Sequence, residues 1–132
     1  MSRVFADTFY FLALLNQADA AHQKAVECSK VIDRLVTSEW VLTEVADGLA
    51  VSRHRNRFGL LRRELLAEQI ALVVPLNMAT HQAGIDLYAS RPDKEWSLTD
   101  CISFVIMERE ALRQALTGDH HFEQAGFLAL LK

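Results

Sequence analysis

Cysteine, proline and glycine are scarce in this chain, whose 132 residues include two cysteines, two prolines and five glycines. Cys28 and Cys101 lie far apart and form neither a CxxC pair nor a metal-like spacing with a histidine. The sequence therefore predicts neither a disulfide framework nor a zinc site, and we expect both thiols to remain reduced. No segment has the composition of a linker, a repeat or a low-complexity tract, so we expect one domain over residues 1–132.

Long apolar runs and a secretory signal are also lacking. The longest apolar run, from Phe9 to Leu15, is far shorter than the roughly 20 residues that span a bilayer. The N-terminus has no basic, apolar and small-residue signal layout, so we expect a cytoplasmic protein without a membrane span. Apolar residues make up 51% of the chain, which argues against disorder and is enough for one hydrophobic core.

The chain has no strong charge bias. Fourteen basic and seventeen acidic side chains give a net charge of −3, which is too small to identify a partner. The positive charges are unevenly distributed, however, because five of the ten arginines fall between Arg53 and Arg63 and no acidic residue occurs from Gly48 to Arg63. The sequence therefore predicts one locally positive surface.

Short apolar segments alternate with longer helical patterns along the chain. The segments short enough to be buried strands are Val4–Ala6, Leu35–Thr37, Ile70–Val74, Ala115–Thr117 and Phe127–Ala129. Helical patterns run at about Phe9–Leu15, Ala18–Arg34, Glu39–Val51, Arg57–Glu68, Met78–Ser90 and Leu98–Arg109. Strands separated by helices pair in parallel, because a parallel connection needs a long crossover. The predicted fold is a three-layer α/β/α arrangement with a central parallel sheet of about five short strands.

Acidic residues occur where such a fold places its functional groups. Asp7 follows the first predicted strand, and Asp119 follows the fourth, so both carboxylates should lie at the carboxyl edge of the sheet. Glu44 and Asp100 stand on the apolar faces of their helices, where a solvated residue is not expected. Unpaired carboxylates that converge in a low-dielectric environment repel one another, so they must take up protons or bind a cation, for which a hard divalent metal ion is suited.

Each acid also has a purely structural interpretation. Asp7 and Asp119 precede helices and could be N-caps, while Ser97 and Asp100 match the capping box S-x-x-D. Glu44 has no capping role, and its structural alternative is a partly buried carboxylate paired with an arginine.

Four stretches of the chain resemble the PIN domain family, and most closely its VapC-like toxin ribonucleases. These stretches are Val4–Thr8, Thr43–Val45, Ser97–Phe104 and Ala115–Phe122, in family order and at family spacing. The four acidic positions of the family fall on Asp7, Glu44, Asp100 and Asp119. One departure is Phe9, which stands where many members carry a small polar residue, so we expect no supporting hydrogen bond from that side chain.

The resemblance implies a metal-dependent endoribonuclease that hydrolyses RNA phosphodiester bonds, with one or two Mg²⁺ or Mn²⁺ ions as cofactor. Asp7, Asp100 and Asp119 would be direct metal ligands, and Glu44 would be a ligand or act through metal-bound water. The neighbouring hydroxyls of Thr8, Ser97 and Thr99 could orient a carboxylate or hold such a water, although Ser97 also fits a plain N-cap. The resemblance further implies a small cognate antitoxin as partner and a homodimer.

The arginines could provide the positive surface that an RNA backbone requires. The candidates for phosphate contacts are Arg53, Arg55, Arg57, Arg62 and Arg63, for which a solvated helix face is the alternative. His120 and His121 follow Asp119 directly, but a neutral imidazole is a less natural Mg²⁺ ligand than a carboxylate, so a structural role is favoured for both.

Three other classes of protein share part of this pattern. A phosphoryl-accepting receiver domain usually has an acidic pair after its first strand and a late lysine, whereas Asp7 stands alone here and the only lysine after Lys94 is Lys132. A haloacid-dehalogenase-like phosphatase would need an aspartate where Phe9 stands. A catalytically silent PIN-like RNA-binding or scaffolding protein would keep the fold without the metal, but all four acids are present.

Overall fold

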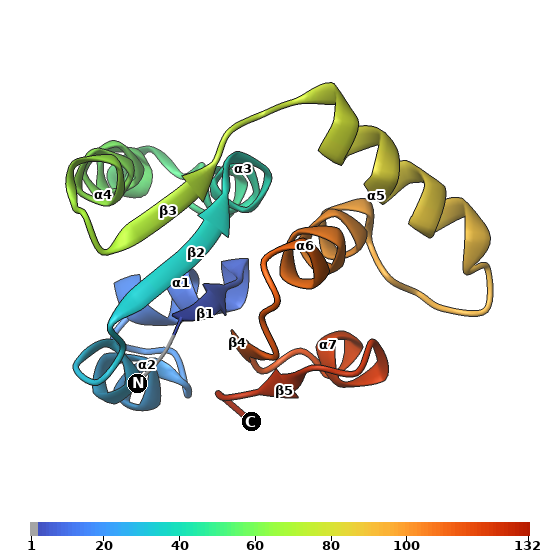
Figure 1. Ribbon diagram of the computed structural model, residues 1–132. Helices are drawn as coiled ribbons and strands as arrows, with labels where there is room; N and C mark the ends of the chain where they lie inside the picture. Colours follow the sequence, from blue (N-terminus) through green and yellow to red (C-terminus); the bar gives the residue numbers. More distant parts are fainter. Residues whose placement is uncertain (1–2) are drawn as a thin grey trace.

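The computed structural model describes residues 3–132, which form one five-stranded parallel sheet with helices on both faces (Figure 1). The strand order is β3-β2-β1-β4-β5, so the first strand lies in the centre of the sheet. The strands are β1 (Arg3–Ala6), β2 (Arg34–Ser38), β3 (Ala71–Val74), β4 (Gln114–Leu116) and β5 (Leu128–Ala129). All four strand pairs are parallel, and the sequence-based prediction of a three-layer α/β/α fold is therefore confirmed.

Seven α-helices and one short 3-10 helix connect the strands within the described residues. They are α1 (Thr8–Leu15), α2 (His22–Ser29), α3 (Glu39–Gly48), η1 (Ser52–His54), α4 (Arg55–Ala67), α5 (Met78–Ser90), α6 (Leu98–Arg109) and α7 (His120–Gln124). Within residues 3–132, none of these helices combines the length and the apolar character needed to cross a bilayer.

Side-chain caps mark the starts of α3, α5, α6 and α7, and the predicted starts of the first three are correct. α5 and α6 have the predicted bounds because the side chains of Asn77 and Ser97 accept hydrogen bonds from the first turns. The prediction of one helix over Ala18–Arg34 is wrong in length. The Asp19 carboxylate accepts the Ala21 N–H and forms a turn before α2, and Arg34 already belongs to β2. The short helix α7 was not among the predicted helices.

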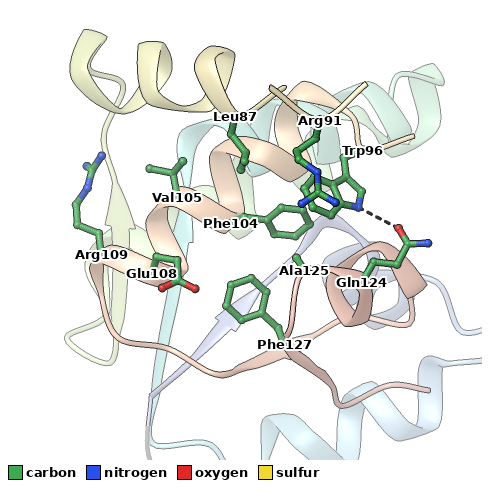
Figure 2. A pocket seen from close by; sticks show the side chains of 10 residues that line it. All are labelled: Leu87, Arg91, Trp96, Phe104, Val105, Glu108, Arg109, Gln124, Ala125 and Phe127. Atoms are coloured by element: carbon green, nitrogen blue, oxygen red, sulfur yellow. Dashed lines mark hydrogen bonds between the residues drawn. The ribbon is translucent and has the colours of Figure 1, made fainter. Parts of the chain in front are cut away.

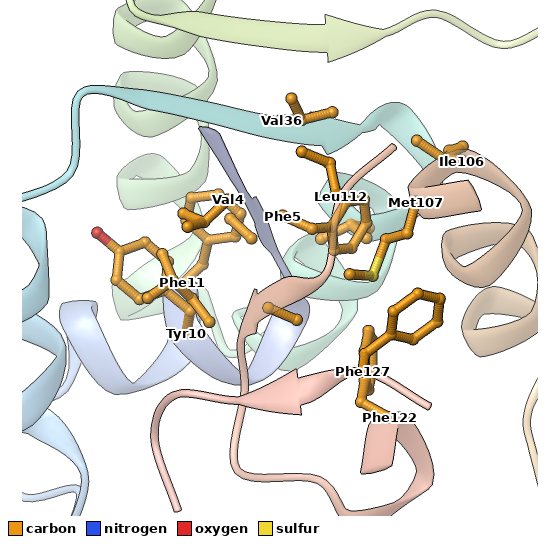
Figure 3. Close-up of a cluster of buried hydrophobic side chains, with 14 of the residues drawn as sticks. Val4, Phe5, Tyr10, Phe11, Val36, Ile106, Met107, Leu112, Phe122 and Phe127 are labelled. Carbon is orange, nitrogen blue, oxygen red and sulfur yellow. The ribbon is translucent and has the colours of Figure 1, made fainter. Parts of the chain in front are cut away.

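The hydrophobic core surrounds the central strand. Val4, Phe5 and Ala6 are fully buried, and the Phe5 ring lies against Phe122 of α7 with 6.4 Å between ring centroids. Figure 3 shows this strand among the apolar side chains of α1, α6 and the C-terminal segment. Because β1 is packed from both faces, the residue that follows it, Asp7, emerges at a rigid point of the sheet edge.

Two glycines in helices provide a matched test of the packing. On α5, a Cβ at Gly84 would overlap Cγ1 of Ile102 and lie 3.1 Å from its Cα, so Gly84→Ala should lower the free energy of unfolding by about 1–3 kcal/mol. On α4, a Cβ at Gly59 meets nothing within 4 Å, so Gly59→Ala should raise it by up to about 1 kcal/mol. Urea unfolding measures both, and equal effects of the two changes would contradict close contact between α5 and α6.

Candidate active site

Asp7 is the buried centre of the acidic residues. It follows β1 and precedes α1, but its side chain does not cap that helix; instead the Thr117 hydroxyl donates to Asp7 Oδ2 at 2.8 Å. The pKa of Asp7 is raised to about 7, chiefly by burial and also by the negative charges of Asp100 and Glu44, while the Thr117 hydrogen bond opposes the rise. Asp100 and Glu44 therefore each lie close enough to Asp7 to repel its carboxylate.

Asp100 is placed by the start of α6. The side chains and backbones of Ser97 and Asp100 form a reciprocal capping box, in which Ser97 Oγ accepts the Asp100 N–H and Asp100 Oδ2 accepts the Ser97 N–H. Burial raises the pKa of Asp100, and the charge of Asp119 raises it further, while the Ser97 hydrogen bond lowers it. The capping interpretation of Asp100 is therefore correct, and the same carboxylate also belongs to the acidic group.

Asp119 is placed in the same manner at the start of α7. Its Oδ1 accepts the His121 N–H at 2.9 Å, and its own N–H donates to the Thr117 hydroxyl at 3.0 Å. Thr117 thus donates to Asp7 and accepts from the backbone of Asp119, which fixes the two acids relative to each other. Thr117 was not among the residues predicted from the sequence, although a buried threonine at the carboxyl end of a strand was a usable signal.

Glu44 approaches the group from α3. The Thr8 hydroxyl donates to Glu44 Oε1 at 2.5 Å, so Thr8 orients this carboxylate. No ion pair within residues 3–132 joins Glu44, Asp7 or Asp100 to a lysine or arginine. The alternative in which Glu44 pairs with an arginine is therefore not observed, and in the part of the chain that the structure describes no lysine or arginine balances the charge of these three acids.

Within the described residues, the nitrogen-containing side chain that contacts two of the acids is an imidazole. His121 Nδ1 lies 3.2 Å from Asp100 Oδ2 and 3.4 Å from Asp119 Oδ1, so it bridges acids from α6 and α7. Asp119, His120 and His121 offer ligand atoms that all lie within 4.8 Å of one another. The sequence favoured a structural role for both histidines and gave no sign of this bridge, because the bridge depends on how α6 and α7 pack.

A second contact joins the segment before α6 to α7. Trp96, which precedes the capping box of α6, donates from Nε1 to Gln124 Oε1 of α7 at 3.0 Å (Figure 2). The Arg91 guanidinium covers the Trp96 ring at 5.0 Å from its centroid. These residues border a cavity of about 620 Å³ whose wall also includes Phe104 and Phe127. The Trp96–Gln124 hydrogen bond joins the segment before α6 to α7, beside this cavity and apart from the acidic side chains.

The arginines differ in how available they are for RNA. Arg62 makes two hydrogen bonds to the Glu39 carboxylate, and Arg55 and Arg57 donate to the backbone carbonyls of Ala50 and Leu15. Of the five arginines between Arg53 and Arg63, the other two, Arg53 and Arg63, are exposed. Arg62 would have to leave its carboxylate partner to bind a phosphate.

The comparisons with known proteins agree with this fold. The sequence profile of the PIN domain matches residues 4–128. The chain belongs to the PIN domain family. This membership excludes the receiver and phosphatase alternatives. The 23S rRNA-specific endonuclease VapC20 of Mycobacterium tuberculosis (strain H37Rv) is 26% identical to this PIN domain over 127 residues, which are 95% of each chain.

Solved structures give the same relationship. The crystal structure of Mycobacterium tuberculosis VapC20, described as a sarcin–ricin loop cleaving toxin, aligns with a TM-score of 0.85 and 25% identity over 95% of this chain and 96% of that one. FitAcB of Neisseria gonorrhoeae aligns with a TM-score of 0.66 and 16% identity, over 98% of this chain and 95% of that one. VapBC2 of Rickettsia felis, bound to a promoter DNA fragment, aligns with a TM-score of 0.66 and 13% identity, over 98% of this chain and 96% of that one. The last two show the shared fold alone.

The raised pKa of Asp7 predicts how the stability of the metal-free protein depends on pH. Since the pKa is 3.8 for a free side chain and about 7 in the fold, the folded state binds the extra proton between these values, and stability falls as pH rises from about 4 to 7. Asp7→Asn removes this loss, which is on the order of 4 kcal/mol in total and about 2–3 kcal/mol between pH 5 and pH 8. Unfolding curves in EDTA at pH 5 and pH 8 measure it; a difference between variant and wild type that does not grow with pH contradicts the burial of a charge at Asp7.

Proposed function

We propose that this PIN domain is a metal-dependent endoribonuclease that hydrolyses RNA phosphodiester bonds, and that it is the toxin of a type II toxin–antitoxin pair. The observation that carries the proposal is the group of four carboxylates from separate elements, Asp7, Glu44, Asp100 and Asp119, whose charges no lysine or arginine balances within residues 3–132. The similarity to a relative named as an rRNA endonuclease supports the choice of RNA as substrate.

The oxygen donors of the acidic group suit a divalent cation, although in residues 3–132 the group of three side chains whose ligand atoms already lie within 4.8 Å of one another is Asp119, His120 and His121. A buried carboxylate whose pKa is raised by burial and by two neighbouring carboxylates is stabilised by a bound cation, and the oxygen donors suit Mg²⁺ or Mn²⁺. Asp7, Asp100 and Asp119 would hold the ion, with Glu44 as a further ligand or as the acceptor of a hydrogen bond from metal-bound water. When bound, the ion would lower the pKa of a water molecule and offset charge on the scissile phosphate.

The chain's own residues keep the acids in position. Thr117 and Thr8 hold the carboxylates of Asp7 and Glu44 through hydroxyl hydrogen bonds, which leave the second oxygen of each available. Ser97 fixes the orientation of Asp100 through the capping box. His121 keeps Asp100 and Asp119 at one end of the site, because its Nδ1 lies within 3.4 Å of both. Thr99, beside Asp100, is the remaining candidate for holding a water molecule.

RNA and protein partners complete the proposal. Arg53 and Arg63 are the exposed candidates for phosphate contacts, while Arg55, Arg57 and Arg62 would first have to give up the contacts that they make in the fold. The similarity to the VapBC and FitAB structures supports a small cognate antitoxin, and a homodimer is compatible with it. An rRNA substrate would be met in the cytoplasm.

Removal of single charges tests the nuclease proposal. Asp100→Asn and Asp119→Asn should each abolish cleavage of a sarcin–ricin loop RNA hairpin in the presence of Mn²⁺, because each removes a metal ligand without opening a cavity. Gel analysis of the RNA measures cleavage, and the circular dichroism spectrum controls for folding. Glu39→Gln removes one negative charge outside the acidic group, from the ion pair with Arg62, and serves as the charge-removal control. Full cleavage by both Asn variants would disprove the assignment of this site.

The bridge formed by His121 can be tested separately. His121→Leu should weaken Mn²⁺ binding by about 10- to 100-fold, because Asp100 and Asp119 lose the group that holds them together. His121→Asn places an amide N–H near the position of Nδ1 and should restore part of the affinity. Gln124→Leu breaks the contact with Trp96 and should lower stability with little effect on Mn²⁺ binding. Calorimetric titration gives the affinities, and equal affinity of the Leu and Asn variants would contradict the bridge.

A further inference from the structure

Phe9 is an exposed aromatic ring next to the acidic group. Its side chain is 37% exposed, although it belongs to the first turn of α1, whose remaining aromatic residues Tyr10 and Phe11 are buried. Within residues 3–132, Phe9 and Tyr88 are the two aromatic side chains among the exposed large hydrophobic residues. Tyr88 lies near the end of α5, whereas Phe9 lies two residues after Asp7.

The ring of Phe9 is held against the loop that leads to Asp119. A Cβ on Gly118 would lie 2.5 Å from Cζ and 2.9 Å from Cε2 of Phe9, so the edge of the ring occupies the space above this glycine. The backbone conformation does not require glycine at position 118, because among the glycines of the described residues the positive φ belongs to Gly126. Gly118 therefore provides room for the Phe9 ring, and the contact restricts how the ring can turn.

This contact places a partly exposed aromatic ring between the backbone segments that carry two of the acids. Asp7 and Phe9 lie where β1 leads into α1, and Gly118 and Asp119 lie where β4 leads into α7. A hydrogen bond from the Asp7 N–H to the Leu116 carbonyl joins these two segments. The ring carries no charge, so it adds nothing to the binding of a metal ion or a phosphate. An aromatic face beside a nuclease site suits the stacking of a nucleobase, because every base has an apolar π face.

We propose that Phe9 is a stacking platform for one unpaired nucleobase of the RNA, adjacent to the phosphate that is cleaved. The inference rests on the proposed function, since it assumes that RNA is the substrate, and it adds the group that holds a base. Gly118 is a positioning residue for this platform because it lets the ring lie on the loop. An RNA with an unpaired base at this position is then preferred over a continuous duplex, in which each base is stacked on its neighbours.

RNA binding by variants of Phe9 tests the platform. All proteins carry Asp100→Asn so that the RNA stays intact, and fluorescence anisotropy measures the affinity for a fluorescein-labelled sarcin–ricin loop hairpin. Phe9→Leu keeps an apolar side chain without a π face and should weaken binding roughly 5- to 100-fold. Phe9→Tyr keeps the ring and should bind within about twofold of the parent. Tyr88→Leu, the matched control, should leave the affinity unchanged.

Three further measurements separate stacking from other causes. The salt dependence of binding should keep the same slope in Phe9→Leu, because no phosphate contact is lost. Hairpins with a single abasic nucleotide should identify one position where loss of the base weakens binding to the parent but not to Phe9→Leu. Gly118→Ala, which pushes against the ring, should weaken binding when Phe9 is present and have a smaller effect after Phe9→Leu.

The outcomes distinguish this inference from the proposed function. Cleavage of the hairpin by the unaltered chain, together with equal binding by Phe9→Leu and Phe9→Tyr, would overturn the platform and leave the nuclease intact. The platform is equally overturned if every abasic hairpin loses as much affinity with Phe9→Leu as with the parent. Absence of cleavage by the unaltered chain would instead count against the nuclease itself. The platform is supported if Phe9→Leu weakens binding and if one abasic position weakens binding to the parent but not to Phe9→Leu.

Discussion

Repulsion between carboxylates at one edge of the sheet is the constraint on which this structure depends. Asp7 is buried at the end of the central strand, and its pKa is raised to about 7 by burial and by the charges of Asp100 and Glu44. A protein that needed only stability would place an apolar residue there. The fold keeps the acid and places the Thr117 hydroxyl on it, with the His121 imidazole on Asp100 and Asp119. Under the proposed function, a bound cation would relieve the repulsion that this arrangement leaves.

The hydrogen bonds around the acids show how helix capping and site geometry are combined. Asp100 and Asp119 both begin helices, so the backbone of α6 and of α7 fixes the direction of each carboxylate. His121 then links the two helix starts, and Thr117 links Asp119 to Asp7. A capping role and a proposed metal-binding role are therefore compatible for these residues. The caps hold the Asp100 and Asp119 carboxylates close enough for their negative charges to repel.

Much of the fold and of the acidic group could be predicted because both follow from local sequence. Short apolar strands alternate with helices, and strand ends locate Asp7 and Asp119 without knowledge of packing. The roles of His121 and Arg62 could not be predicted in this way. His121 contacts Asp100 only because α6 and α7 pack side by side, and Arg62 is held by Glu39 of another helix. The length of α2 was mispredicted since the Asp19 turn interrupts a continuous helical pattern.

The most direct test of the central claim is a crystal structure of the protein soaked in Mn²⁺, with anomalous scattering used to locate the ion. We expect a manganese peak bounded by carboxylate oxygens of Asp7, Asp100 and Asp119, with Glu44 nearby. A peak held instead by Asp119, His120 and His121, whose ligand atoms also lie within 4.8 Å of one another, would contradict the proposed arrangement. The absence of an anomalous peak beside Asp7, in a crystal soaked at a saturating Mn²⁺ concentration, would contradict it as well.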